Sequence, residues 1–142
     1  MKRFLITLIL AMYANAASAD QPVIYPFEGS FDDATFNIET AIIGQGLVID
    51  YVSHTGDMLN RTGSDLGADE EIFKAADIFL FCSAVLSRKV MEIDPLNIAH
   101  CPYNIFVFED KTGVKIGHRN YPEGPMKEVQ SLLGSIVNEA LE

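Results

Sequence analysis

Basic residues are scarce in this 142-residue chain, which has 10 lysines and arginines against 20 aspartates and glutamates and a formal net charge of −10. Binding to nucleic acid requires clustered basic side chains that neutralise phosphates. Attachment to an anionic lipid surface likewise requires a polybasic segment. The composition therefore argues against both nucleic acid and anionic lipid as partners.

Long apolar runs are also missing, apart from one at the N-terminus. Residues 4–12 are almost entirely apolar, but this run is far shorter than the roughly 20 residues that span a bilayer. It follows Lys2 and Arg3 and precedes three small residues at 17–19. A basic start, a short apolar run and a small-residue end together form the pattern of a secretory signal peptide.

A cleaved signal peptide is therefore predicted at 1–19, followed by a single mature domain at 20–142. The mature chain is expected to have no stable membrane anchor and to be periplasmic or secreted. No cysteine precedes Cys82, which excludes the lipidated type of signal that needs a cysteine at the cleavage site. Loss of Lys2 and Arg3 changes the net charge from −10 to −12.

Cysteine is limited to Cys82 and Cys101, and no Cys-x-x-Cys or Cys-x-x-Cys-His pattern occurs. This argues against a thioredoxin-like centre and against covalently attached c-type haem. In an oxidising compartment, two cysteines are first interpreted as a disulfide. Because His100 directly precedes Cys101, the alternative is a metal or redox site in which sulfur and imidazole hold copper or haem iron. Both possibilities stay open, and the sequence identifies no cofactor.

A catalytic cysteine would need a base and a group that orients the base. Side chains of adjacent residues in a strand point to opposite faces, so His100 is poorly placed to activate Cys101. His54 and His118 are predicted to be ordinary surface or edge residues. The sequence therefore favours a function without catalysis.

The mature chain alternates between strand and helix patterns. Ser30 lies three residues before Asp33, which resembles a capping box, and apolar residues follow at helical spacing. Strand patterns on either side of a turn at 110–113 predict a hairpin. The expected elements are strands at 23–27, 47–52, 78–82, 103–109 and 114–119, helices at 31–44, 69–75, 83–93 and 126–140, and a loop at 53–67 that contains at most a helical turn.

This order of elements predicts an α+β fold. The economical packing is a two-layer sandwich, in which a mostly antiparallel sheet of about five strands carries the helices at 31–44 and 126–140 on one face. The short helix at 83–93 is an insertion. Pro26 cannot donate to a ladder, which places the first strand at an edge. Apolar residues on the uncovered sheet face could bind a ligand or a second copy of the chain.

The segments at 81–91, 94–95 and 100–109 resemble those of a known family. A Cys-Ser-Ala helix start, an Asp-Pro pair and a Cys-Pro-Tyr strand start occur in the same order in domain-of-unknown-function family 302, and the resemblance covers about residues 22–141. It implies a strand–helix–four-strand–helix fold similar to TATA-binding-protein-like domains, with a small helix inserted between the two cysteines. The family often occurs as a dimer, which implies a homodimer, and it brings no established activity.

Two hypotheses about function result. The first is a non-enzymatic exported domain that binds a small ligand or a partner through the uncovered sheet face, as a homodimer. The second is a redox or metal-handling protein that uses Cys82, Cys101 and His100. Buried, bridged cysteines would favour the first hypothesis, and reduced sulfurs converging near an imidazole would favour the second.

We predict that the exported protein begins at Asp20. Signal peptidase requires small residues at the first and third positions before its cleavage site, and Ala19 and Ala17 occupy these positions. Mass spectrometry of the N-terminal peptide from a periplasmic fraction measures the cleavage directly. Ala19→Arg is expected to block cleavage. A wild-type chain that retains Met1 in the cytoplasm would contradict the prediction.

Overall fold

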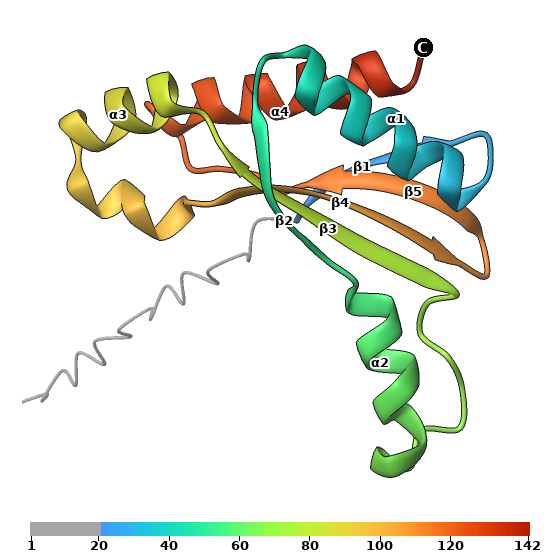
Figure 1. The fold of residues 1–142 in the computed structure, drawn as a ribbon. Helices are drawn as coiled ribbons and strands as arrows, with labels where there is room; N and C mark the ends of the chain where they lie inside the picture. Colours follow the sequence, from blue (N-terminus) through green and yellow to red (C-terminus); the bar gives the residue numbers. More distant parts are fainter. Residues whose placement is uncertain (1–20) are drawn as a thin grey trace, which may run out of the picture.

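A five-stranded sheet organises residues 21–142, the part of the chain that the computed structural model describes (Figure 1). The signal peptide predicted at 1–19 lies outside the described residues. The strands are β1 (Val23–Phe27), β2 (Val48–Ser53), β3 (Ala75–Cys82), β4 (Tyr103–Asp110) and β5 (Gly113–His118). They lie in the order β1-β5-β4-β3-β2, and every neighbouring pair is antiparallel.

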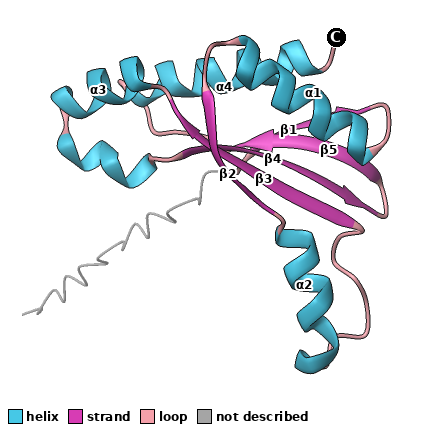
Figure 2. Ribbon diagram, in the orientation of Figure 1, coloured by secondary structure: helices cyan, strands magenta, loops and turns pink. Residues whose placement is uncertain are grey.

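Two long helices, α1 (Phe31–Gly44) and α4 (Met126–Ala140), cover one face of the sheet. Figure 2 shows both on the same side of the strands. Their apolar residues and alternate strand residues form one buried core, and this burial is the main source of stability. The strand residues with no exposed surface are Phe81, Tyr103, Ile105, Val107 and Ile116. This arrangement confirms the predicted two-layer α+β sandwich.

Helix α1 begins at the predicted capping box. The Ser30 hydroxyl accepts a hydrogen bond from the Asp33 backbone N–H (3.1 Å), and the Asp33 carboxylate accepts one from the Ser30 N–H (3.3 Å). Two N–H groups that a helix start leaves unpaired are thereby satisfied. Ile38 and Ile42, one turn apart, are fully buried against the sheet.

Strand β1 lies at an edge of the sheet, as Pro26 predicted. It pairs only with β5, so β5 lies inside the sheet between β1 and β4. The predicted β4–β5 hairpin is present, and the Asp110 carboxylate supports its turn by accepting a hydrogen bond from the Thr112 backbone N–H (2.7 Å). The strand order therefore places the last strand of the chain, rather than the first, in an interior position.

The connection between β2 and β3 differs from the prediction. The expected loop at 53–67 contains a helix, α2 (Thr55–Gly63), and a 3₁₀ turn, η1 (Ser64–Leu66). The helix expected at 69–75 is absent, and β3 starts at Ala75 rather than at residue 78. Both of these predictions were wrong. Figure 1 shows α2 projecting away from the sheet on the side opposite α1 and α4, and we call residues 55–74 the arm.

Tertiary contacts explain these differences. A Cβ on Gly56 would lie 2.5 Å from the Ala76 backbone nitrogen, so only glycine, a poor helix former, lets α2 approach β3 this closely. At the other end of the arm, the Lys74 backbone N–H donates to the Glu109 carbonyl (2.8 Å). This bond extends the β3–β4 pairing and draws the chain into an extended conformation where the local pattern indicated a helix.

A second excursion connects β3 to β4. It consists of α3 (Ala84–Ile93), which confirms the helix predicted at 83–93, and a 3₁₀ helix, η2 (Pro95–His100). We call residues 84–100 the lobe. Helix α3 ends just before Asp94 and Pro95, because the residue before a proline avoids the helical region. Within residues 21–142, no helix is long and apolar enough to span a membrane.

We predict that Leu133→Ala lowers the free energy of unfolding by about 2–5 kcal/mol, because truncation leaves a cavity in a close-packed core. The Leu133 side chain has no exposed surface in α4. Urea denaturation followed by circular dichroism measures the change. Leu96→Ala is the control, since Leu96 is 77% exposed, and its effect should stay within about 0.5 kcal/mol. Equal effects of the two changes would contradict the packing described here.

Candidate functional site

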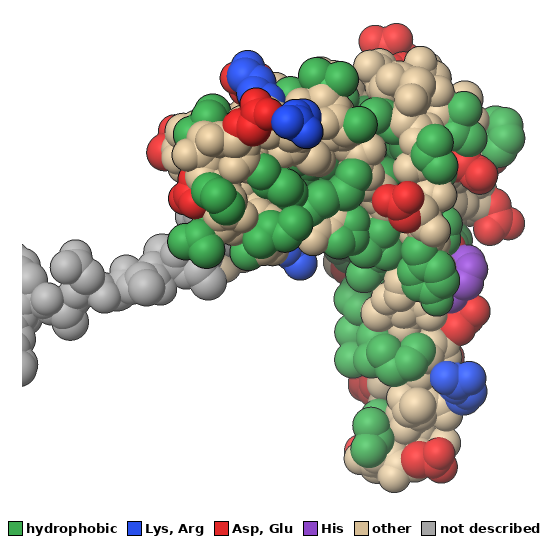
Figure 3. All heavy atoms as spheres, turned by 60° about the vertical axis from the view of Figure 1, so that its left-hand side comes forward, with side chains coloured by type: hydrophobic (Ala, Val, Ile, Leu, Met, Phe, Trp, Pro, Cys, Tyr) green, Lys and Arg blue, Asp and Glu red, His purple; other side chains and the backbone are tan. Residues whose placement is uncertain are grey.

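The sheet face opposite α1 and α4, which we call the open face, is apolar. Strand side chains alternate between the two faces, so the neighbours of the buried core residues point to the open face. Its apolar side chains are Ile24, Val48, Tyr51, Ile78, Leu80, Phe106 and Phe108. Val48 and Tyr51 are 73% and 66% exposed. Figure 3 shows hydrophobic side chains gathered on the body and continuing down the arm.

Gly117 allows neighbouring side chains to pack closely across the middle of the open face. A Cβ on Gly117 would lie 2.6 Å from the Phe106 ring and 2.7 Å from the terminal methyl group of Ile24. Without that Cβ, both side chains lie across β5, and Phe106 also stacks on Phe108 with ring centroids 6.2 Å apart. Sequence analysis did not single out Gly117, although a glycine inside a strand signals such a close approach.

Acidic side chains avoid the middle of the open face. The strands contain four acidic residues, and the alternation of faces directs Asp77 and Glu109 to the helix-covered side. Asp110 lies beside the hairpin turn and pairs with Lys115 (2.7 Å). The Lys115 ammonium holds the pKa of the Asp110 carboxyl well below its usual range. Asp50 lies in the irregular part of edge strand β2.

The arm extends the apolar surface beyond the sheet. Phe73 packs edge-on against Phe108, with ring centroids 5.3 Å apart, and so joins the arm to the open face. Met58, Leu66 and Ile72 of the arm are 43%, 82% and 65% exposed. Large apolar patches exposed on a folded chain are typical of interaction sites.

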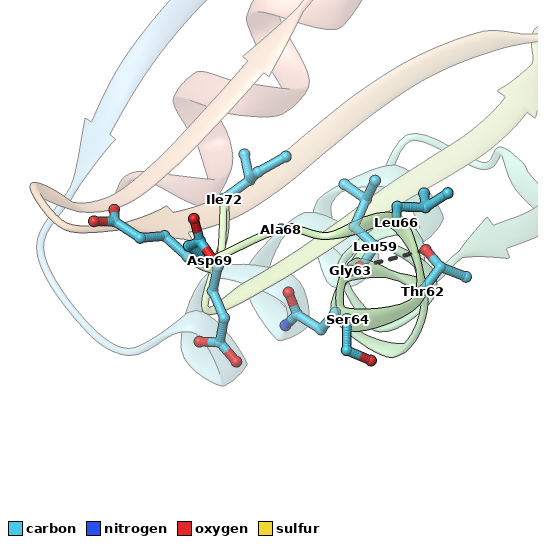
Figure 4. Close-up of a pocket in the computed structure, with 11 residues that line it drawn as sticks. Leu59, Thr62, Gly63, Ser64, Leu66, Ala68, Asp69 and Ile72 are labelled. Carbon is cyan, nitrogen blue, oxygen red and sulfur yellow. Dashed lines mark hydrogen bonds between the residues drawn. The ribbon is translucent and has the colours of Figure 1, made fainter.

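A hollow of about 250 Å³ lies within the arm, between α2, η1 and the returning chain (Figure 4). Leu59 and Leu66 line it on the side of α2 and η1, and Asp69 and Ile72 line it on the returning segment. None of its lining residues is a cysteine, histidine, lysine or arginine. The hollow therefore offers no cationic side chain that would hold an anion.

Cys82 and Cys101 lie together at the end of the sheet opposite the arm. The β3–β4 register pairs Phe81 with Tyr103. Cys82 follows Phe81 and Cys101 lies two residues before Tyr103, so the two cysteines are close in space. Both cysteines are free and half-buried. This agrees with the sequence argument that antiparallel neighbouring strands would bring the two residues to the same sheet end.

Burial controls the protonation of Cys101. It raises the pKa of the Cys101 thiol to about 11, and the neighbouring Cys82 side chain adds to the rise, while a hydrogen bond from the Ser87 hydroxyl opposes it. The Ser87 hydroxyl also lies 3.0 Å from the Tyr103 hydroxyl. At neutral pH Cys101 is therefore a thiol rather than the thiolate that acts as a nucleophile.

His100, the third residue of the predicted metal site, lies against aromatic rings. Its imidazole packs edge-on against Tyr121, with ring centroids 5.6 Å apart, and Tyr121 packs in turn against Tyr103 at 6.4 Å. Within residues 21–142, no group of three or more His, Cys, Asp or Glu side chains is placed to hold a metal ion. The structure thus brings the two sulfurs together and gives His100 a packing contact with Tyr121.

The remaining histidines, His54 and His118, differ in burial. His54 is 62% exposed and its Nδ1 lies 2.8 Å from the Asp77 carboxylate. His118 was predicted to be a surface or edge residue but is only 1% exposed, because β5 lies inside the sheet and α4 covers it. Its Nδ1 lies 2.8 Å from the Arg119 carbonyl oxygen, and burial lowers the pKa of its imidazole.

Comparison with known proteins finds one family match. The family described as "Domain of unknown function DUF302" matches residues 23–135. A crystal structure of an uncharacterized conserved protein DUF302 from Bacillus stearothermophilus superposes with a TM-score of 0.59 at 14% sequence identity, over 84% of this chain and 86% of that chain. At this identity the likeness concerns the fold alone. No curated protein gives a significant match.

We predict that burial of His118 makes the fold less stable at mildly acidic pH. Since its folded-state pKa is lowered below the usual value of about 6.5, the unfolded chain binds the proton more readily. The stabilisation is complete above about pH 6.5 and is lost as pH falls from there through the lowered folded-state value. Urea denaturation at a series of pH values between 5 and 8 measures the slope.

His118→Phe keeps a ring in the core but cannot titrate, so the slope of the free energy of unfolding against pH should become smaller. His54→Gln is the control, because the His54 side chain is mostly exposed in the folded chain. An unchanged slope in His118→Phe, or an equal reduction in His54→Gln, would contradict the assignment.

Proposed function

Since the chain belongs to the family described as domain of unknown function DUF302, whose description states no activity, we propose a function from the geometry of the sheet. The protein is an exported, non-enzymatic binding domain that docks through its open face, and its partner is a second copy of itself. The observation that carries this proposal is the apolar sheet face that neither α1 nor α4 covers.

The composition of the open face supports docking. Leu80 and Phe106, at its centre, are half-buried, while Tyr51 and Val48 at its margin are mostly exposed. Removing apolar surface from water is favourable by about 25 cal/mol per Å². A second apolar layer on this face would give the sheet the same cover that the helices provide on the other side.

The distribution of charge selects the open face as the surface on which a second copy docks. The exported chain, without Lys2 and Arg3, has a net charge of −12, so two copies repel each other wherever acidic surfaces meet. At the middle of the open face this repulsion is weakest, because Asp77 and Glu109 point to the covered side and Asp110 is paired with Lys115. An isologous dimer, in which the same patch meets itself, therefore brings together the least acidic parts of the sheet.

The surface area that a stable dimer buries indicates a role for the arm. Strands spaced about 4.8 Å apart, with a length of about 20 Å, give five strands a planar footprint of roughly 480 Å². A standard interface buries about 800 Å² per partner, so the sheet alone is too small. The arm lies on the same side of the sheet as the open face (Figure 1), and its exposed apolar side chains, including Met58 and Ile72, supply further area.

Two observations support a function without catalysis. Burial raises the pKa of Cys101 to about 11, which is the wrong direction for a catalytic thiol. The His54 imidazole that pairs with Asp77 lies at the end of β2 beside the arm, while the cysteines lie at the opposite end of the sheet. Export is supported by the N-terminal pattern at residues 1–19.

We predict that the wild-type protein forms a dimer and that Tyr51→Glu weakens it at least about tenfold, or 1.4 kcal/mol. The substitution places a carboxylate from each protomer into an interface that excludes water. Sedimentation equilibrium over a range of protein concentrations measures the dissociation constant. Because Tyr51 is 66% exposed, the change leaves the core intact, and circular dichroism verifies folding.

Phe36→Glu is the matched control, since Phe36 of α1 is 68% exposed and lies away from the open face. It adds the same charge and removes a similar ring, and it should leave the dimer unchanged. A wild-type chain that is monomeric over the whole concentration range would contradict the proposal. So would a dimer that Phe36→Glu dissociates while Tyr51→Glu does not.

A further inference from the structure

The two cysteines lie at the base of the lobe. Cys82 ends β3 one residue before the helix cap of α3, and Cys101 directly follows η2. The pairing of Phe81 with Tyr103 brings the two ends of the lobe together, and the Cys82 side chain is close enough to Cys101 to raise the pKa of the Cys101 thiol. A covalent bond between them would close the lobe at its base.

Most contacts that hold the lobe to the rest of the molecule are only half-buried. They include Leu86 and Met91, which pack against the core, and His100, which packs on Tyr121. Of residues 84–100, all of which the structure describes, Val90 alone is fully buried. The Ser87 and Tyr103 hydroxyls lie 3.0 Å apart, and an exposed ion pair joins Lys89 to Glu128 of α4 (2.7 Å). Exposed ion pairs stabilise little. Segments with few buried apolar contacts open locally at low cost in free energy.

Apolar residues cover much of the outer surface of the lobe. The large apolar side chains of the lobe with more than half of their surface exposed are Val85, Ile93, Leu96 and Ile98. Local opening of the lobe would expose more apolar surface next to the end of the sheet. A link at the base of the lobe would therefore restrict an apolar segment that few fully buried residues anchor.

We propose that Cys82 and Cys101 are an oxidation site, at which a disulfide-class oxidant forms an intramolecular bond that fixes the lobe to the sheet. One thiol loses its proton and attacks the oxidant R–S–S–R, releasing one R–S⁻ and forming a mixed disulfide. The second cysteine attacks that mixed disulfide and releases the second R–S⁻. The two cysteines are oxidised to one S–S bond, the oxidant is reduced to two R–SH, and the two protons pass from the cysteines to these products.

The environment of Cys101 makes one route of bond formation and one route of bond cleavage slow. A thiol whose pKa is raised to about 11 is rarely ionised at neutral pH, so the attack by Cys101 is slow. It is also a poor leaving group, so an external thiol that attacks the Cys82 sulfur and expels Cys101 reduces the finished bond slowly. The pair is therefore suited to fixing the lobe once rather than to repeated turnover. This inference goes beyond the proposed docking function and does not depend on it.

The test starts from fully reduced, purified protein treated with oxidised glutathione. After quenching with acid and alkylation of the remaining thiols, denaturing mass spectrometry should find a chain that is lighter by two hydrogens and carries neither glutathione nor an alkyl group. Cys82→Ser should instead keep one glutathione or one alkyl group on Cys101. Limited proteolysis within residues 84–100 should slow on the order of tenfold after oxidation of the wild-type protein.

The Cys82→Ser Cys101→Ser double variant, treated in the same way, is the control for proteolysis and should show no change. Two alkylated thiols after prolonged oxidation, two stable glutathione adducts, or a disulfide-linked dimer would each overturn the proposal. So would copper that copurifies with the wild-type protein and is lost from both single cysteine variants. The bond should form equally well in Tyr51→Glu, so a failure of docking and a failure of oxidation are distinguishable.

Discussion

The sheet is apolar on both faces, but the two long helices cover only one of them, and the rest of the structure depends on this mismatch. On the covered side, Phe81, Ile105 and Ile116 have no exposed surface. On the other side, Phe106 and Leu80 are only half-buried. Antiparallel sheets commonly expose one polar face to water. Here that face is largely apolar. Asp77 and Glu109 point to the covered side, and Asp110 is paired with Lys115, which is the physical reason to expect a second layer there.

The two excursions from the sheet follow from its antiparallel topology. Successive strands run in opposite directions, so the β2–β3 connection leaves at one end and the β3–β4 connection leaves at the other. The arm extends the open face, because Phe73 packs on Phe108. The lobe joins the helix layer, where Val90 enters the core. Strand β3 therefore connects an arm on one side of the sheet with a lobe on the other.

Local signals predicted the elements whose cause is local. The capping box at Ser30 set the start of α1, Pro26 placed β1 at an edge, and the turn after Asp110 set the hairpin. Helix α2 was missed because Gly56 matters through its contact with β3, which no helical periodicity reveals. The burial of His118 was missed for the same kind of reason, since it depends on β5 lying between β1 and β4.

In the candidate sites, too, local patterns predicted where residues lie, while tertiary contacts determine their properties. The proximity of Cys82 and Cys101 followed from antiparallel neighbours, but the protonation of Cys101 depends on burial, which raises its pKa and which the sequence does not express. The open face followed from counting layers, but its continuity depends on Gly117, where Phe106 and Ile24 cross β5. Cys82 pairs with Val48 at one end of the open face, but the two features use different chemistry. Assembly through the open face and oxidation at the base of the lobe are therefore separable properties of one fold.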